Sequence, residues 1–346
     1  MPLKCPLKSL DQSFLATRPT VKIVILIAAV LLGGVVLVEL GLRWGLGLGR
    51  PPLYQADDAI GYLLAPNQRL RRFGNRILIN VYSMRNGPIQ SQRPAATLRV
   101  LLLGDSIVNG NWWTDQSETL SALLEKAIQD QLATTPFNDY SAAEVLNVSA
   151  NSWGPRNQQA YLERYGTFAA QVVVLVLNTD DLFATAPTAL QVGRDPGYPD
   201  RNPPGAIAEL ISRRRKQGQP IPGLKAVQNE SGDRVGKNLA AVAAVHQQVT
   251  AAGGQLVLVL TPLKREVLPP GPRDYELTAR QRVSDWVNDH DIPYVNFLGD
   301  FQAVDDPETL YRDHIHLSPT GNQQVKDQLL EAVRGAIATQ PAPSSL

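Results

Sequence analysis

An unbroken apolar run near the middle of the sequence places the strongest constraint on the fold. Residues 171–178 read QVVVLVLN, with no polar side chain between the first and last positions. A strand of this composition is buried on both faces, which is typical of the centre of a parallel sheet that helices cover on both sides. We therefore expect this segment to form a central strand of an α/β domain.

Apolar runs of similar length recur on both sides of this strand. The candidate strands occupy residues 98–104, 143–149, 171–178, 255–263 and 293–297. The segments between them show apolar residues at helical spacing, and the last helix is expected to have Ser318 as its N-cap and Pro319 at its first position. Strands that alternate with helices predict an α/β fold with a three-layer, doubly wound parallel sheet.

A second apolar run lies close to the N-terminus. Residues 21–40 read VKIVILIAAVLLGGVVLVEL and carry no charge between Lys22 and Glu39. About 20 apolar residues suffice for a helix to cross a bilayer, and Trp44 stands where an interfacial anchor is expected. A cleaved signal peptide is the alternative, but the preceding polar segment is long and no small-x-small cleavage site follows. We expect residues 21–42 to form an uncleaved transmembrane anchor in the lipid bilayer.

The charges that flank this run are distributed unequally. The N-terminal flank carries four basic residues and one acidic residue: Lys4, Lys8, Arg18 and Lys22, with Asp11. The other flank carries two basic and three acidic residues: Arg43 and Arg50, with Glu39, Asp57 and Asp58. Because basic residues favour the cytoplasmic side, we expect a single-pass protein with a cytoplasmic N-terminus and an exported domain on the periplasmic or extracellular side. The only cysteine, Cys5, excludes an internal disulfide.

These features divide the chain into segments. We expect a cytoplasmic segment at 1–20, the anchor at 21–42, a stalk with a lead-in strand at 43–97, the α/β domain at 98–338 and a disordered tail at 339–346. Residues 185–235 are rich in proline and glycine and too long for an ordinary connection, which predicts a lid or a flexible insertion.

The overall charge argues against a nucleic-acid partner. The formal net charge is only +1, which provides no basic field for a polyanion. The basic run RRRK at residues 213–216 is most simply a solvated loop.

A serine stands where the first strand of the domain ends. Ser106 follows LRVLLLGD, and ligands of open α/β sheets bind at the carboxyl ends of the strands. A serine nucleophile needs a base and a group that orients the base. Of the four histidines, His246 lies within an Ala/Val-rich helix and His290 at a helix end, whereas His314 and His316 precede the last helix.

These two segments together resemble the GDSL or SGNH hydrolase family, a group of α/β serine esterases and acyltransferases with a flavodoxin-like fold. The resemblance rests on GDS at the end of the first strand and on DHIHLSPTG before the final helix, and it covers most of residues 98–338. It implies that Ser106 is the nucleophile, that His316 is the general base and that Asp313 orients the imidazole. The lead-in INVYSMRNG is similar to the Asn-x-x-Gly-x-Arg segment of membrane-anchored members, with Ser83 where glycine is usual.

The resemblance also implies an oxyanion hole. Its donors would be the N–H of Ser106, a second-block N–H from Gly154 or alternatively Ser152, and an asparagine side chain after the central strand. Counting along that strand places Asp180 at the position of the asparagine, where an ionised carboxylate would repel the oxyanion. Three solutions are open: Asn178 points into the site, Asp180 is protonated, or the site does not perform ordinary ester hydrolysis. We favour Asn178.

Two tryptophans follow the serine closely. Trp112 and Trp113 either belong to the core or bind substrate by stacking on a sugar ring. His314 and His316 lack a further histidine nearby in the sequence, so we expect no metal site, and no cofactor is implied.

The function expected from these features is a membrane-anchored serine esterase. It would act through an acyl-Ser106 intermediate on acyl or acetyl esters of a cell-envelope saccharide. An O-acyltransferase with the same triad is an alternative, and a membrane acyl-donor protein would then be its partner. A non-catalytic binding protein that keeps the fold is the third interpretation.

Overall fold

The computed structural model describes residues 19–339. The expected cytoplasmic segment up to residue 18, which includes Cys5, and the tail from residue 340 lie outside the described residues.

A five-stranded parallel sheet forms the centre of the domain. Its strands are β5 (Thr97–Gly104), β6 (Ala142–Ser149), β7 (Val172–Asn178), β8 (Gln255–Thr261) and β9 (Tyr294–Asn296). They lie side by side in the order β6-β5-β7-β8-β9, and all neighbours are parallel. This 2-1-3-4-5 order is that of flavodoxin-like doubly wound sheets. The predicted fold class is confirmed, and each expected strand is present within about two residues of its predicted bounds.

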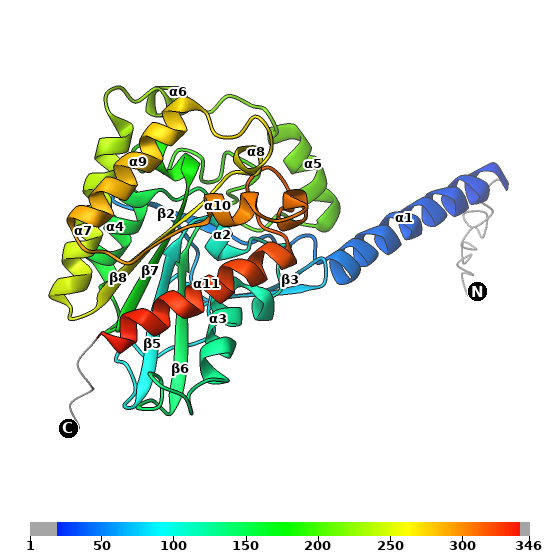
Figure 1. Cartoon of the computed structure of the whole chain (residues 1–346). Helices are drawn as coiled ribbons and strands as arrows, with labels where there is room; N and C mark the ends of the chain where they lie inside the picture. Colours follow the sequence, from blue (N-terminus) through cyan, green and yellow to red (C-terminus); the bar gives the residue numbers. More distant parts are fainter. Residues whose placement is uncertain (1–18, 340–346) are drawn as a thin grey trace, which may run out of the picture.

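Helices cover both faces of the sheet, as the apolar runs require. One layer contains α4 (Pro155–Tyr165), α7 (Arg234–Ala251) and α9 (Asp274–Asp289). The other contains α3 (Leu120–Gln129), α10 (Phe297–Gln302) and α11 (Pro319–Ala338), and α11 crosses in front of the sheet in Figure 1. Alternate residues of β5 face opposite layers: Leu101 and Leu103 pack in the first, Val100 and Leu102 in the second.

Short helices connect these larger elements. They are α2 (Ser106–Asn109), η2 (Gln116–Glu118), η3 (Thr179–Phe183), α5 (Ala206–Lys216), α6 (Leu224–Gln228), α8 (Lys264–Val267) and η4 (Pro307–Leu310). Ser318 caps α11 by accepting a hydrogen bond from Gly321 N, and Pro319 stands at the first helical position, as predicted.

The segment at 43–97 contains a strand, as expected for the lead-in, but it is more structured than a stalk. It folds into two antiparallel hairpins, β1 (Tyr54–Asp57) with β2 (Gly61–Leu64) and β3 (Gln68–Arg72) with β4 (Asn75–Ile79). Apolar side chains of both hairpins are buried in the same core as α4 and α7: Tyr54, Ile60, Tyr62, Leu63, Ile77 and Ile79. Strands of four or five residues carry too few apolar positions to be recognised in the sequence. This packed segment therefore has a sequence similar to that of a linker.

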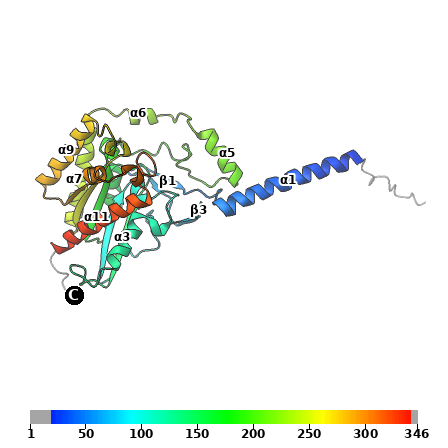
Figure 2. The same ribbon diagram turned by 45° about the vertical axis from the view of Figure 1, so that its right-hand side comes forward.

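A long apolar helix projects from the domain. This helix, α1 (Pro19–Leu46), is seen in two orientations in Figures 1 and 2. Within it, Val21–Leu46 is long and apolar enough to cross a membrane and is not buried against the rest of the protein. The helix continues four residues beyond the expected end of the anchor at residue 42.

The proline- and glycine-rich insertion is hydrogen-bonded to α1. The N-terminus of α5 lies beside the end of α1, where the Glu39 carboxylate accepts hydrogen bonds from Ala206 N and Ile207 N at 2.7 and 2.9 Å (Figure 2). The basic run 213–216 is the last turn of α5, not the expected loop.

Candidate active site

Ser106 occupies the first position of α2, immediately beyond the carboxyl end of β5. Asp105 caps this helix, because its carboxylate accepts a hydrogen bond from Ile107 N at 2.8 Å. Gly104 permits the tight approach of the helix, since a Cβ there would lie 2.4 Å from a methyl carbon of Val108. Strand, cap and helix thus fix the Ser106 side chain at the edge of the sheet, where it is 8% exposed.

His316 and Asp313 meet this serine. His316 Nε2 lies 2.9 Å from Ser106 Oγ, and His316 Nδ1 lies 2.8 and 3.0 Å from the two carboxylate oxygens of Asp313. A proton on Nδ1 is shared with the carboxylate, so Nε2 is free to accept the hydroxyl proton. The structure therefore brings together the three residues expected as a triad, from segments about 210 positions apart in the chain.

The Asp-x-x-His spacing forms a tight turn before α11. Asp313 Oδ1 accepts hydrogen bonds from Ile315 N at 3.0 Å and from His316 N at 2.8 Å. Burial raises the pKa of Asp313, but the hydrogen bonds from this backbone and from the imidazole outweigh it and keep the pKa below its ordinary value. The carboxylate is thus charged and holds both the turn and the ring.

His314 points elsewhere. Its side chain is 83% exposed, and its Nδ1 lies 3.8 Å from Asp313 Oδ1. It lies at the rim of the cavity and makes no hydrogen bond to Ser106 in the described structure. Among residues 19–339, no group of three or more His, Cys, Asp or Glu side chains has the arrangement of a metal site.

A buried amide lies between two carboxyl groups beneath the serine. Asn178 Nδ2 donates to Asp105 Oδ2 and to Asp181 Oδ2, each at 3.0 Å. Burial raises the pKa of Asp105, and it raises that of Asp181 well above the ordinary range because Asp105 also faces it. This pair therefore holds a proton more tightly than an exposed carboxyl group does.

The residues expected as oxyanion donors differ in their surroundings. The Asn178 amide contacts two carboxyl groups, and Gly154 N donates to Asn157 Oδ1 at 3.0 Å as part of the cap of α4. Asn178 and Ser152 line the cavity, whereas Gly154 does not. Ser152 has a positive φ of 57°, the conformation that glycine adopts most easily. Asp180 also lines the cavity, and burial raises the pKa of its carboxyl.

The serine opens into a cavity of about 570 Å³. Its walls combine apolar and polar surface, and the hydroxyl and amide side chains among them include Tyr62, Asn111, Asn151, Ser152, Gln191 and Tyr198. Residues 184–188 and 197–198 contribute one side, so the insertion predicted as a lid or flexible segment is a wall of the site. Tyr198 OH reaches across to donate to Ser152 Oγ at 3.0 Å.

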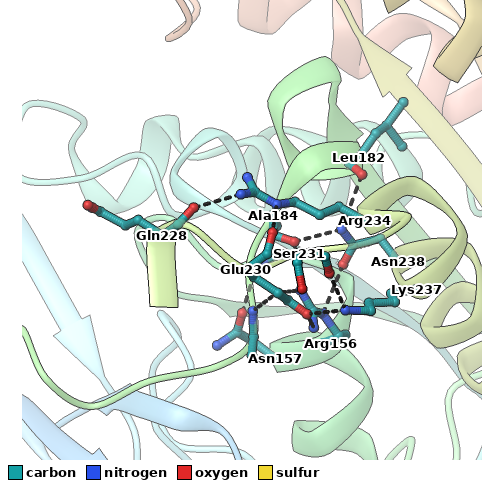
Figure 3. A network of polar contacts seen from close by, with 12 residues as sticks. Arg156, Asn157, Leu182, Ala184, Gln228, Glu230, Ser231, Arg234, Lys237 and Asn238 are labelled. Atoms are coloured by element: carbon teal, nitrogen blue, oxygen red, sulfur yellow. Dashed lines mark hydrogen bonds and ion pairs between the residues drawn. The ribbon is translucent and has the colours of Figure 1, made fainter. Parts of the chain in front are cut away.

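An ion-pair cluster holds this wall in place (Figure 3). Arg156 of α4 pairs with both oxygens of Glu230 at 3.0 and 2.8 Å and donates to Ala184 O at 2.7 Å. Glu230 also accepts from Lys237 Nζ and from Ala186 N, both at 2.8 Å. The Arg156 guanidinium lowers the pKa of Glu230 to about 2, so the carboxylate keeps its charge over the physiological range.

The two tryptophans lie beside the site without lining the cavity. Trp113 packs edge-on against the His316 ring at 4.9 Å, with Arg312 over its other side at 4.9 Å. Trp112 packs against Trp113 at 5.3 Å and against Phe73 of the β3–β4 turn at 4.8 Å. Neither ring is therefore placed to stack on a ligand within this cavity. Trp113 instead packs against the imidazole of His316.

Sequence analysis missed several residues of this site. Asp181 stands in NTDDLF next to the predicted Asp180, and the sequence does not show that its side chain is buried. Tyr62 and Tyr198 come from the lead-in and the insertion, where no local pattern marks a binding residue.

Comparisons with solved structures return matches at low identity. An acetyl xylan esterase, AlAXEase, is 17% identical with a TM-score of 0.44, covering 68% of this chain and 99% of its own. TesA is 20% identical with a TM-score of 0.41 over 69% and 97%, and a lipase/acylhydrolase from Enterococcus faecalis is 13% identical with a TM-score of 0.43 over 71% and 99%.

Sequence comparisons are more decisive. No curated protein matches the chain significantly. The family model of the GDSL-like lipase/acylhydrolases, however, matches residues 102–324, which is more than half of the chain and includes Ser106, Asp313 and His316. The chain belongs to the GDSL-like lipase/acylhydrolase family.

Proposed function

We propose that the protein is a membrane-anchored serine ester hydrolase that acts through an acyl-Ser106 intermediate. The observation that carries this proposal is the continuous contact from Ser106 Oγ through His316 to the Asp313 carboxylate. His316 Nε2 takes the hydroxyl proton as Oγ attacks the acyl carbonyl, and then returns it to the leaving alcohol oxygen. Water, deprotonated by the same nitrogen, next attacks the acyl-enzyme and releases the carboxylic acid and free Ser106.

Backbone groups are the proposed donors to the oxyanion. The N–H groups of Ser106 and Ser152 belong to the segments that follow the neighbouring strands β5 and β6, and both residues line the cavity. Asn178 acts indirectly in this proposal: its amide holds Asp105, which caps the helix that starts at Ser106.

The proposed substrate is an acyl or acetyl ester of a cell-envelope saccharide. Hydroxyl and amide groups on the cavity wall match the hydroxyl groups of a sugar, and the volume suits a ligand of that size. The proposed anchor at residues 21–42, with a cytoplasmic N-terminus, would place the cavity on the exported side of the bilayer.

Two further candidate functions each have one observation in their favour. An O-acyltransferase would use the same triad with a saccharide hydroxyl in place of water, and membrane anchoring would bring it near a membrane acyl-donor protein. A non-catalytic binding protein is favoured by the Asn178 amide, which is already engaged by two carboxyl groups.

A fluorophosphonate probe tests the enzyme against the binding protein. The full chain should be labelled at Ser106, while Ser106→Ala should not be labelled. Absence of labelling in the intact chain, with the fold verified by circular dichroism, would favour the binding protein. Acetyl release from an acetylated saccharide, with and without added acceptor glycan, separates hydrolysis from transfer.

A reporter fusion tests the topology. An enzyme that is active only outside the cytoplasm, fused after Leu346, should be active if the domain is exported. Activity of a cytoplasm-specific reporter at the same position would contradict the proposed orientation.

A further inference from the structure

A groove rich in arginine lies where α1 joins the domain. The last turn of α1, the following loop and the β3–β4 hairpin enclose about 560 Å³. Five arginines line it: Arg43, Arg50, Arg69, Arg71 and Arg76. Trp44, Leu48, Leu70 and Leu78 supply apolar surface in the same groove.

The strand pairing of the hairpin explains why the arginines gather. Arg71 is paired directly with Arg76 and Arg69 with Leu78, so these side chains share one face. That face is solvent-exposed at Arg69, Arg71 and Arg76, whereas the intervening Ile77 is buried in the core. The strand period of two therefore places the basic residues outward as a set.

Most of this positive charge is unpaired within the described part of the chain. Arg43 pairs with Glu39, and Arg76 pairs with Asp115 at 2.8 Å. Arg50, Arg69 and Arg71 make no ion pair with a carboxylate among residues 19–339, and Arg71 Nε donates instead to the carbonyl of Gly74 at 3.3 Å. Three uncompensated guanidinium groups in one groove favour an anionic ligand.

The groove is built rigidly onto the end of α1. Phe73 N, in the β3–β4 turn, donates to Leu46 O at 2.9 Å. Gly47 has φ of 68°, and a Cβ there would lie 1.8 Å from Arg71 O, so only glycine allows this contact. Arg72, on the opposite face of β3, donates to Gly47 O at 3.1 Å and forms a buried ion pair with Glu209 of α5.

The position of the groove along α1 coincides with the bilayer surface. Lys22 and Glu39 bracket an uncharged stretch of about 24 Å of helix, which covers most of the roughly 30 Å hydrocarbon thickness of a bilayer, and Arg43 follows one turn later. Trp44 follows directly and is 80% exposed, as expected for an interfacial side chain. Given the membrane anchoring proposed above, the arginines face the headgroup region.

We infer that this groove binds the phosphate of an anionic phospholipid headgroup, with Arg69 and Arg71 as its principal contacts. Guanidinium groups bind phosphate oxygens in bidentate geometry, and the apolar side chains beside them suit the start of an acyl chain. This is a lipid site separate from the cavity at Ser106, and it fixes the rotation and depth of the domain on the membrane.

Trp44 provides a reporter for the test. The full chain in neutral detergent micelles is titrated with brominated phosphatidylglycerol or brominated phosphatidylcholine, and quenching of tryptophan fluorescence is recorded. The wild-type chain should show tighter binding of phosphatidylglycerol by about tenfold or more, and Arg69→Gln with Arg71→Gln should remove this preference. The matched control is Arg214→Gln with Arg215→Gln, which removes the same charge from exposed positions of α5 and should change the preference less than about twofold.

Three results would each overturn the inference: equal quenching by the two lipids in the wild-type chain, equal losses in the two double variants, or complete displacement of the lipid by millimolar inorganic phosphate. Thermal unfolding and esterase activity verify that the double variants are folded. Extraction of cell membranes with alkaline carbonate tests anchoring by itself, so failure of the anchor and failure of the lipid site give different results.

Discussion

Replacing Asp313 by asparagine should separate its role in catalysis from its role in the turn. The carboxylate makes two kinds of contact: Oδ1 accepts from Ile315 N and His316 N, and both oxygens contact His316 Nδ1. Asparagine retains the carbonyl oxygen for the backbone but places an N–H against Nδ1. The imidazole proton must then move to Nε2, which faces Ser106 Oγ at 2.9 Å and can no longer accept the hydroxyl proton.

The expected size of the effect follows from these contacts. Asp313→Asn should lower kcat by about 10⁴, equivalent to about 5.5 kcal/mol of transition-state stabilisation, with little change in KM. Its free energy of unfolding should stay within about 0.5 kcal/mol of the wild type, because the backbone acceptor is kept. Asp313→Ala should be less stable than the wild type by about 1–2 kcal/mol in free energy of unfolding, since two backbone N–H groups lose their acceptor.

The assay combines initial rates on a small aryl acetate with urea unfolding of the same preparations. Wild-type activity in Asp313→Asn would refute the proposed orientation of His316 by the carboxylate. Equal losses of stability in Asp313→Asn and Asp313→Ala would refute the proposal that the Asp313 oxygen stabilises the turn by accepting from the backbone.

Three further predictions concern neighbouring side chains. Ser106→Ala and His316→Ala should each lower aryl acetate turnover by at least about 10³, while His314→Ala should leave it nearly unchanged because that side chain is exposed. Trp113→Ala should lower kcat by about tenfold with little effect on KM, since its ring supports His316 outside the cavity. Asp181→Asn should reduce a decline of stability with rising pH, to which the buried Asp105 carboxyl still contributes. Above about pH 4 the unfolded chain releases the Asp181 proton, whereas the raised pKa retains it in the folded chain, so a rise in pH favours unfolding of the wild type.

Each of these predictions has a result that would contradict it. Loss of activity in His314→Ala alone would mean that the wrong histidine was chosen. A large rise in KM for Trp113→Ala would restore substrate stacking, and Trp113→Phe, which keeps an aromatic ring, is the matched control. For Asp181, the free energy of unfolding in urea is measured at about pH 5 and about pH 8. If Asp181→Asn differs from the wild type by the same amount at both pH values, Asp181 does not retain a proton in the folded chain.

The sheet could be predicted from sequence because its signal is local. Each strand is an apolar run bounded by polar residues, and burial on both faces leaves no ambiguity about which side chains point inward. The two hairpins of the lead-in could not be predicted, because their signal is not local. These hairpins bury Tyr54 and Ile77 in the same core as α4 and α7, and that core exists only after the chain has folded.

The candidate site shows the same division. The spacing of Asp313 and His316 lies within one turn and could be identified from the motif, as could the position of Ser106 after its strand. The state of Asn178 could not be predicted, because its amide is engaged by Asp105, 73 positions earlier, and by Asp181. Burial of two carboxyl groups against one amide is a tertiary fact with no sequence pattern of its own.

The insertion connects the two ends of the molecule that matter most for the proposed function. Tyr198 contacts Ser152 at the cavity, and eight residues later the backbone of Ala206 is bonded to Glu39 on α1. One segment therefore forms a wall of the cavity and holds the helix proposed as the anchor. With the anchor in a bilayer, the cavity is kept at a fixed height and orientation above the surface. Such an arrangement favours a substrate that is presented at the membrane over one that diffuses freely, which is consistent with an ester carried on a cell-envelope saccharide.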